Sequence, residues 1–262
     1  MQIDAPDAYI GASELDLIER WLPMRGRVVL ELGCGRAWMT RQMASRFAPR
    51  HIIATEVDRV QYQRNLCIDD LPNVRFVYGG AEAIDLPEAS VDCVLMLKSL
   101  HHVPRGQMSR ALEEIARVLR PGGLAYISEP VYRGAFNDIL KLFNDEREVR
   151  RLAFEALFRS VREGLFESVE QIFFNAPGHY RDFAEFEERM LHVTHTEHRI
   201  DAPLHQRIRD AQVCRYLVKD FGTSQSPKST RQRDSRYCPD RPALITTPSR
   251  TLQQSCSCAT PS

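Results

Sequence analysis

Two acidic residues flank a glycine turn near the start of the chain, with the types and spacing of a site for a positively charged nucleoside. The segment from Leu30 to Trp38 contains Glu31, followed by Gly33 and Gly35. Glycine lets the backbone turn sharply and approach a ligand closely. The helix expected after the turn presents free backbone N–H groups at its start. The carboxylate of Glu31 suits an ammonium group and would repel a pyrophosphate.

Glu56 supplies the second acidic group, 25 residues after Glu31. It ends the second apolar run of the chain, and a carboxylate at such a strand end can accept hydrogen bonds from both hydroxyls of a ribose. A solvated acid at a strand end is the alternative. We predict ribose binding, because the position agrees with the geometry of ribose-binding α/β folds.

The turn departs from the fingerprint of dinucleotide-binding proteins. Trp38 stands where the third glycine of Gly-x-Gly-x-x-Gly would be. A bulky indole would hinder a pyrophosphate at that helix end. Together with Glu31, it makes a nicotinamide-dependent oxidoreductase the less favoured alternative.

Histidines offer further chemistry. His101 and His102 follow the fourth apolar run, where an imidazole could take a proton from a substrate near neutral pH. Alternatively, the pair only shapes the loop and the start of the next helix. Other histidines recur at His192, His195, His198 and His205. No cysteine or carboxylate set completes a metal site around them, so we predict no metal.

The first half of the sequence alternates strands and helices that could position these residues. Short apolar runs predict buried strands at 27–32, 52–55, 74–78, 91–96 and 124–128. A helix is expected at 37–47, and helical periodicity predicts another at 108–119, ended by Pro121-Gly122-Gly123. Buried strands separated by helices favour an α/β fold: a Rossmann-like, doubly wound, mostly parallel sheet with helices on both faces.

The second half is predicted to be mostly helical. Strand candidates beside the fifth strand are 169–174 and, less convincingly, 213–218. The helices at 134–162 and 182–211 are candidates for a substrate cap. Their aromatic residues fit either an apolar or aromatic small molecule or core packing: Phe136, Phe143, Phe154, Phe158 and Tyr180.

The sequence divides into four regions. Residues 1–24 are expected to form an N-terminal lid or helix, 25–130 the nucleoside-binding core, and 131–221 the helical cap with the remaining sheet elements. From 222 to 262 the chain is rich in Ser, Thr and Pro without hydrophobic periodicity, which predicts a disordered tail. A segment read in a shifted frame is an alternative explanation of that composition.

Several segments, in order, resemble the class I S-adenosylmethionine-dependent methyltransferases, particularly the small-molecule group that includes ubiquinone-biosynthesis methyltransferases. These segments cover about half the chain and lie at 29–35, 54–58, 80–87, 90–94, 99–104 and 117–123. Two positions depart from the family pattern. The Gly-x-Gly-x-Gly pattern ends in Ala37, which many members tolerate, and Gly80 stands where many members have an aspartate that bonds the adenine amino group. Adenine recognition here is therefore expected to be weaker or limited to the main chain.

The resemblance implies S-adenosylmethionine as cofactor and gives roles to individual residues. Glu31 would face the methionine ammonium directly or through water, Glu56 would hold the ribose, and Lys98 would line the methionine side. Ala81 and Glu82 would border the adenine. The remaining cofactor contacts would come from Gly33, Cys34, Gly35 and Val57.

Composition narrows the class of partner. The 35 basic and 35 acidic residues balance to a formal net charge of zero, which gives no general attraction to nucleic acid or to an anionic membrane. No apolar run is long enough to span a bilayer. The seven cysteines show no paired spacing, as expected of free thiols in a cytoplasmic protein. We therefore predict a cytoplasmic methyltransferase acting on a small-molecule acceptor, or alternatively a catalytically silent relative that only binds.

Overall fold

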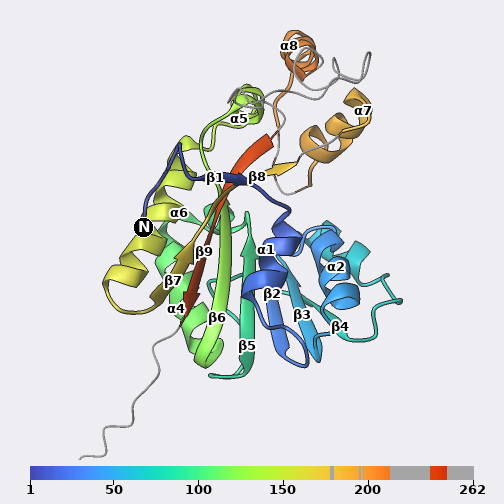
Figure 1. Cartoon of the computed structure of the whole chain (residues 1–262). Helices are drawn as coiled ribbons and strands as arrows, with labels where there is room; N and C mark the ends of the chain where they lie inside the picture. The colour runs from blue at the N-terminus through green and yellow to red at the C-terminus, as the bar shows by residue number, and fades with distance from the viewer. Residues whose placement is uncertain (178–179, 195, 197, 213–236, 247–262) are drawn as a thin grey trace, which may run out of the picture.

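The computed structural model describes residues 1–177, 180–194, 196, 198–212 and 237–246 of the chain (Figure 1). These residues form a sheet with the strand order β1-β8-β9-β6-β5-β2-β3-β4, and β7 pairs with β9. The core of the sheet is parallel, as the sequence predicted. Its five strands are β2 (Val28–Leu32), β3 (His51–Glu56), β4 (Val74–Tyr78), β5 (Val91–Leu97) and β6 (Leu119–Pro130).

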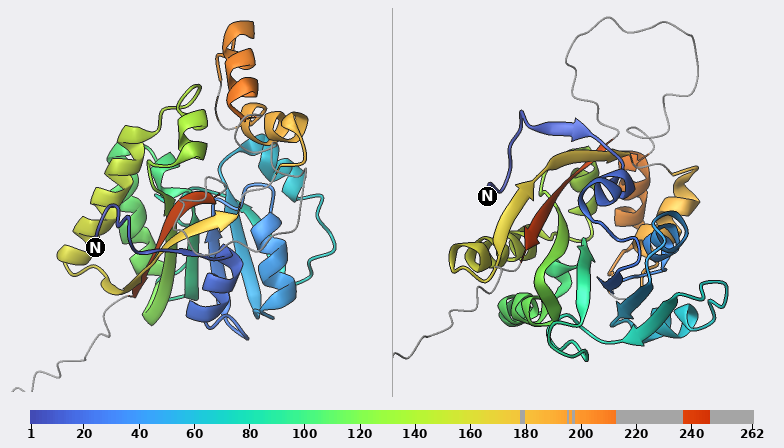
Figure 2. Two further views of the ribbon diagram at one scale, coloured as in Figure 1. Left: turned by 45° about the horizontal axis from the view of Figure 1, so that its top comes forward. Right: turned by 60° about the horizontal axis from the view of Figure 1, so that its bottom comes forward.

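Helices cover both faces of this parallel sheet (Figure 2). Successive residues of β2 show the division: Leu30 packs in one apolar cluster with residues of α4 (Met108–Val118) and α6 (Arg147–Arg162). Val29 packs in the other with residues of α1 (Glu14–Trp21) and α2 (Trp38–Arg46). Side chains of a strand alternate between faces, so a strand covered on both sides is apolar along most of its length, and the buried Glu31 is the exception in β2. The Rossmann-like prediction is confirmed.

The end of α4 differs from the sequence-based expectation. The helix ends at Val118, and Pro121-Gly122-Gly123 lies inside β6. Gly122 has a left-handed φ of 74°. A Cβ on Gly123 would lie 2.8 Å from the carbonyl oxygen of Arg120. The two glycines therefore shape the irregular start of a strand, where the pairing of β5 with β6 shifts register.

The strands beyond β6 correct the expectation of a featureless tail. Residues 237–246 form β9 (Tyr237–Thr246), which pairs antiparallel with β6. The only continuous apolar run in this segment is 243–245, and it aligns with 125–127 of β6. Three apolar residues after two prolines were too short a signal within a Ser/Thr/Pro-rich sequence. The rest of the tail lies outside the described residues.

The predicted strand at 169–174 exists as two shorter ones. They are β7 (Glu167–Gln171) and β8 (Phe173–Pro177), both antiparallel to β9. The N-terminal strand β1 (Tyr9–Gly11) pairs parallel with β8. The weaker candidate at 213–218 lies outside the described residues.

Further helices form a cap at the carboxyl ends of the strands (Figure 1), whereas α3 (Arg59–Asn65) follows β3, and the short helices η1 (Leu100–His102) and η2 (Arg105–Gln107) follow β5. The cap contains α5 (Ala135–Leu140), α7 (Phe183–Phe186), the π-helix η3 (Glu187–Leu191) and α8 (Ala202–Gln212). Its apolar cluster includes Phe136, Phe143 and Tyr180, whereas Phe154 and Phe158 stack on each other along α6 at 6.1 Å. These aromatic residues are packing residues, and none lines the cavity described below.

Candidate functional site

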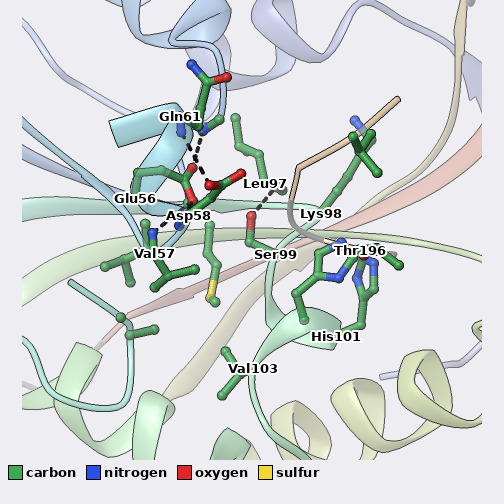
Figure 3. Close-up of a pocket in the computed structure, with 18 of the residues that line it drawn as sticks. Glu56, Val57, Asp58, Gln61, Leu97, Lys98, Ser99, His101, Val103 and Thr196 are labelled. Carbon is green, nitrogen blue, oxygen red and sulfur yellow. Dashed lines mark hydrogen bonds between the residues drawn. The ribbon is translucent and has the colours of Figure 1, made fainter. Parts of the chain in front are cut away.

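A cavity of about 980 Å³ lies at the carboxyl ends of β2, β3 and β5 (Figure 3). One wall comes from the loops after these strands and after β4. The opposite wall comes from the two predicted cap segments, which contribute Asn144, Asp145, Glu146, Val149, Arg189, His192, Val193, Thr194 and Thr196. Nine of the residues predicted from sequence line this cavity: Gly33, Gly35, Glu56, Val57, Ala81, Glu82, Lys98, His101 and His102.

The glycine turn after β2 is held closely against neighbouring backbone. The N–H groups of Gly33 and Cys34 both donate to the carbonyl of Thr55, at 3.1 and 2.9 Å. Gly33 has a φ of 76°, and a Cβ there would lie 2.7 Å from the hydroxyl of Ser99. Only glycine fits, because both the backbone conformation and the contact exclude a side chain. The turn therefore meets the loop after β5 with no space between them.

Glu56 is fixed by three backbone donors. Its Oε2 accepts from the N–H of Gly35 at 2.8 Å, and its Oε1 accepts from those of Val57 and Asp58 at 2.8 and 2.9 Å. The side chain is buried at the cavity wall. An ionised carboxylate has about four acceptor sites. Glu56 can therefore keep these bonds and still accept from a ligand hydroxyl.

Glu31 and Cys34, also predicted to contact the ligand, do not line the cavity. Glu31 is buried behind the glycine turn, where Thr40 donates to its Oε2 at 2.6 Å. Burial raises the pKa of Glu31 to about 7; the Thr40 hydrogen bond opposes this rise and the charge of Glu56 adds to it. Of the two contacts considered for Glu31, its position favours the one through water.

The thiol of Cys34 is buried and surrounded by protein groups. Burial, and then the charges of Glu31 and Glu56, raise its pKa far above the usual range, so the thiol stays protonated. The side-chain amide of Asn65 donates to its sulfur at 3.4 Å and to the Gly35 carbonyl at 2.8 Å. Cys34 thus supports the turn from behind.

The loop after β4 is anchored by a pair that sequence reasoning missed. Glu114 accepts from the N–H of Ile84 at 3.0 Å, and Arg117 donates to the carbonyls of Ile84 and Leu86 at 2.7 and 2.8 Å. Both residues lie on α4. Their i, i+3 spacing on that helix was the available signal. They hold the loop that carries Ala81 into the cavity wall.

Gly80 and Glu82 share one small space. A Cβ added to Gly80 would lie 2.4 Å from Oε2 of Glu82. The carboxylate of Glu82 therefore lies where a side chain at residue 80 would be. The missing side chain at residue 80 leaves room that an acidic group two residues later fills.

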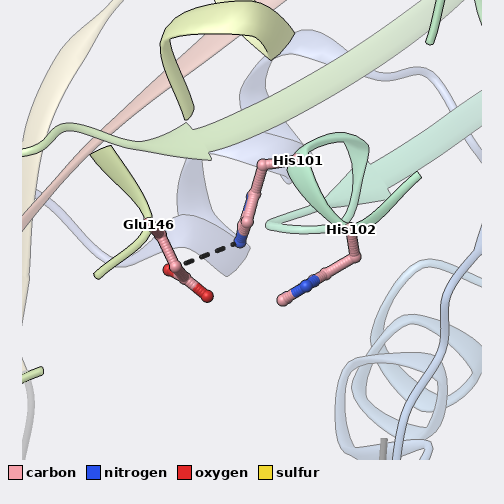
Figure 4. Close-up of side chains that lie close together, drawn as sticks. All are labelled: His101, His102 and Glu146. Carbon is pink, nitrogen blue, oxygen red and sulfur yellow. Dashed lines mark ion pairs between the residues drawn. The ribbon is translucent and has the colours of Figure 1, made fainter. Parts of the chain in front are cut away.

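His101 is held by an acid that the sequence analysis did not single out. Its Nδ1 lies 2.6 Å from Oε2 of Glu129, whose Oε1 accepts from the N–H of Leu100 at 2.9 Å. On the other side of the ring, Nε2 lies 3.7 Å from Oε2 of Glu146 (Figure 4). His102 is the neighbouring ring, with centroids 4.1 Å apart. The available signal for Glu129 was an acid near the end of the fifth predicted strand.

Burial and neighbouring charges shift the pKa values of His101 and Glu129 in opposite directions. Burial lowers the pKa of His101, but the charge and hydrogen bond of Glu129 and the charge of Glu146 outweigh it, so the pKa is raised. For Glu129, burial raises the pKa, and the charge and hydrogen bond of His101 outweigh that, so the pKa is lowered. The ionised acid thus accepts from Nδ1–H and leaves Nε2 directed toward Glu146.

Comparison with known proteins places the core of this architecture in a family. The family model described as a methyltransferase domain matches residues 29–123. These residues include the glycine turn, Glu56 and both histidines of the cavity. Residues 29–123 are a class I methyltransferase domain.

Curated relatives share this domain over part of their length. An uncharacterized methyltransferase of Mycobacterium tuberculosis is 36% identical over 108 residues, which are 41% of this chain and 42% of the relative. The fatty-acid O-methyltransferase of Mycolicibacterium smegmatis is 33% identical over 102 residues, 38% of this chain and 36% of the relative. The chain thus spans about two fifths of the length of these relatives.

Solved structures share the fold more widely. The YcgJ protein of Bacillus subtilis has a TM-score of 0.56 at 16% identity, with 89% of this chain and 97% of that one covered. The [4+2]-cyclase SpnF has a TM-score of 0.53 at 20% identity, covering 89% and 80%. Such distant likeness shows the fold alone. A putative methyltransferase of Bacillus halodurans shares this fold as well, with a TM-score of 0.56 at 16% identity, covering 90% of this chain and 100% of that one.

Lys98 joins the methyltransferase domain to the N-terminal helix. It lines the cavity, and its ammonium forms an ion pair with Oε2 of Glu14 on α1 at 2.6 Å. The residue has a left-handed φ of 55°, at the point where the chain leaves β5. Lys98 therefore lies at the cavity wall just after β5, and its ammonium is paired with Glu14 of α1.

The later histidines do not meet as a metal site within the described residues. His192 lines the cavity, His198 packs edge-on against Phe143 at 5.1 Å, and His205 lies 2.5 Å from the carboxylate of Glu187. His195 lies outside the described residues. None of the helices in the described ranges has both the length and the apolar character needed to cross a bilayer.

Proposed function

We propose that this chain is an S-adenosylmethionine-dependent methyltransferase that transfers a methyl group to a small-molecule acceptor by in-line displacement. The observation that carries the proposal is Glu56, fixed by three N–H groups beside a glycine turn in which Gly33 packs directly against Ser99. A carboxylate in this place suits the two hydroxyls of a ribose. The cavity is also at the upper end of the size range of small-molecule sites, which is about 300–1,000 Å³.

The cofactor roles that we propose follow the cavity wall. Gly33, Gly35, Glu56 and Val57 would contact the nucleoside and methionine parts, and Glu31 would act on the ammonium group from behind the turn. Ala81 and Glu82 would border the adenine, and Lys98 would line the methionine side. Cys34 would support the turn without contacting the cofactor.

Methyl transfer places few demands on side-chain chemistry. The sulfonium methyl is already activated, so the protein mainly aligns the acceptor, at about 3 Å, and excludes water. A proton acceptor is needed only where the nucleophile must lose a proton. His101 suits that role, because Glu129 accepts from its Nδ1–H, and Nε2, which points toward Glu146, is the nitrogen left to take up the proton. His102 would line the path of the acceptor to this ring.

We further propose that the acceptor is a small molecule and that the protein is cytoplasmic. One relative is named for fatty-acid O-methylation, and a methyl acceptor of low molecular weight fits a cavity bounded by the cap. The wall contributed by Asn144, Asp145 and Glu146 is polar. The free cysteines Cys34 and Cys93 are buried in the core, as in proteins of reducing compartments. The zero net charge gives no support for a nucleic-acid partner.

Calorimetry on the full chain tests the cofactor. We expect S-adenosylhomocysteine to bind and NADH not to bind. Glu56→Gln should weaken binding strongly, whereas Glu113→Gln, an exposed residue on α4, should leave it unchanged. Binding of NADH in place of S-adenosylhomocysteine would overturn the proposal in favour of an oxidoreductase.

Transfer of a radiolabelled methyl group into small molecules of a cell extract tests the activity. Labelled product that depends on the chain supports methyl transfer. Tight binding of S-adenosylhomocysteine without any labelled product would favour the second candidate, a binding protein without methyl transfer. The [4+2]-cyclase among the fold neighbours makes this a specific alternative.

A further inference from the structure

Two histidines and one carboxylate converge at the wall of the cavity, where His101 lies apart from Glu56 (Figures 3 and 4). One ligand-type atom from each of His101, His102 and Glu146 lies within 4.8 Å of the others. The histidines follow β5, whereas Glu146 precedes α6. The fold, and no local repeat, brings them together. We propose that these three residues bind a divalent transition-metal ion of the Zn²⁺, Fe²⁺ or Co²⁺ type.

The donor set decides the class of ion. Two imidazoles and one carboxylate are the protein ligands of catalytic zinc sites and of non-haem iron sites, which keep coordination positions open. Hard ions such as Mg²⁺ and Ca²⁺ prefer oxygen ligands throughout. The cluster is therefore matched to a borderline ion with positions left for other ligands.

The spacing is close to that of a bound site. With bonds of about 2.1 Å in a tetrahedron, two ligand atoms lie roughly 3.4 Å apart. Nε2 of His101 and Oε2 of Glu146 are already 3.7 Å apart. All three ligand atoms lie within 4.8 Å of one another, so no pair would have to close by more than roughly 1.4 Å. His102 is the exposed member of the three, and its ring packs against that of His101 with centroids 4.1 Å apart.

Glu129 supplies the outer support that metal-bound histidines usually have. It accepts from Nδ1 of His101 at 2.6 Å and also from the Leu100 N–H at 2.9 Å. Such a carboxylate–histidine–metal arrangement fixes the tautomer and the direction of the ligand nitrogen. In this chain it directs Nε2 of His101 toward Glu146.

Arg150 opposes cation binding, because its positive charge already pairs with the carboxylate of Glu146. It donates from Nε and Nη2 to Oε2 of Glu146 at 3.0 and 2.6 Å, while Asn144 donates to Oε1 at 2.8 Å. These bonds orient the carboxylate and occupy both lone pairs of Oε2 and one of Oε1, so a metal ion would bind Oε1 or replace one of the arginine bonds. With both histidines neutral and Glu129 and Glu146 ionised against Arg150, the formal charges of the cluster sum to about −1. A dication is therefore still attracted.

An ion at this place would bear on the acceptor, and this step rests on the proposed function. Its open positions would face the cavity, where an oxygen atom of the acceptor could bind. His101 cannot then also be the proton acceptor, because one nitrogen lone pair cannot serve both. Metal binding and the base role of His101 are thus alternatives that one experiment separates.

Titration of the chelator-treated full chain with Co²⁺ tests the proposal, since bound Co²⁺ gives visible absorption bands. We expect one site, displaced by Zn²⁺. His102→Ala and Glu146→Gln should weaken Co²⁺ binding at least 100-fold. Glu129→Gln should weaken it about 10- to 100-fold, as loss of outer support does. His51→Ala removes a histidine at the amino end of β3, opposite the cavity, and should change nothing.

The outcomes distinguish this proposal from the function proposed above. Affinity for S-adenosylhomocysteine, measured on the same proteins, should stay within twofold in every variant. No Co²⁺ bands, or equal Co²⁺ affinity in wild type and His102→Ala, would overturn the metal site. Because His102 is exposed, that variant decides the matter even if Glu146→Gln fails to fold. Co²⁺ binding without S-adenosylhomocysteine binding would retain the metal site and refute the methyltransferase.

Discussion

The two ends of the cavity are built from different kinds of contact. At the end around Glu56, which we propose binds the cofactor, most contacts involve backbone groups. The N–H groups of Gly35, Val57 and Asp58 donate to Glu56, and the backbone of Gly33 packs directly against Ser99. At the end around His101 and Glu146, which we propose faces the acceptor, side chains are held by other side chains. Glu129 fixes His101, and Arg150 fixes Glu146.

This difference separates what is general from what is particular in the site. A backbone-built site tolerates many sequences, provided that glycines and strand ends keep their places. A side-chain network depends on every member, because a buried polar group that loses its partner is costly. The cofactor end should therefore suit one constant ligand, whereas the acceptor end can differ between chains with this fold.

The largest expected effect breaks the cofactor end alone. Glu56→Gln replaces one carboxylate oxygen with an NH₂ group that faces backbone donors. We expect affinity for S-adenosylhomocysteine to fall about 100-fold or more, roughly 3 kcal/mol. Glu129→Gln is the matched variant at the acceptor end, and its affinity for S-adenosylhomocysteine should stay within twofold of the wild-type value. If calorimetry shows that both variants lose the same affinity, the two ends do not act separately.

A second test uses the pH dependence of Glu31. Its pKa is about 7 in the folded protein, against an ordinary value of 4.5. The folded protein keeps this proton at pH values where the unfolded chain has released it. The stabilisation is thus complete below pH 4.5 and is lost as pH rises through about 7, by about 3 kcal/mol.

Urea unfolding at pH 5 and pH 8 measures this loss. The difference between the two pH values should be smaller in Glu31→Gln than in the wild type, because the amide does not titrate. If Glu31 acts on the ammonium of the cofactor, wild-type affinity for S-adenosylhomocysteine should also rise from pH 6 to pH 8. If Glu31→Gln shows the same difference in unfolding free energy between the two pH values as the wild type, a group other than Glu31 causes the pH dependence.

A third test separates contact from backbone strain in the glycine turn. Gly33→Ala adds a Cβ that would lie 2.7 Å from the Ser99 hydroxyl, whereas Gly35→Ala meets nothing within 4 Å. Both positions have a left-handed φ. We expect Gly35→Ala to cost about 1 kcal/mol and Gly33→Ala about 3 kcal/mol of unfolding free energy. Adding Ser99→Gly to Gly33→Ala should recover much of the difference; urea curves that show no recovery would assign the cost to strain.

The smallest expected effect sharpens the comparison at the adenine side. Gly80→Asp places a second carboxylate against Glu82, whose Oε2 lies where the new Cβ would be. Affinity for S-adenosylhomocysteine should fall a few-fold, because like charges repel. The double change with Glu82→Ala should restore it to the wild-type value or better. Calorimetry that shows the same loss in both would mean that Glu82 does not occupy the aspartate position.

Sequence patterns were sufficient for the parallel core and for the cofactor end. Apolar runs located β2 to β5, and the carboxyl ends of parallel strands must meet, so Gly33 and Glu56 were expected at one edge. Even there, the sequence did not show that Glu31 is buried behind the turn. A residue type at a strand end does not tell whether its side chain points into the cavity.

The acceptor end and the outer strands were beyond the sequence. His101, Glu129 and Glu146 come from three separate segments, and only tertiary packing brings them together. The strand β9 carries three adjacent apolar residues after two prolines, and its partner strands lie far away in the chain. Long-range pairing of this kind has no local periodicity to reveal it.

The position of β9 also has a consequence for the order of synthesis. It is the only strand joining β8, and through it β1, to the parallel sheet among the described residues. A growing chain emerges at roughly 5–20 residues per second, N-terminal part first. The parallel core can thus assemble during synthesis, whereas β1 cannot be joined to it until β9, which follows every other described strand in the chain, has been made.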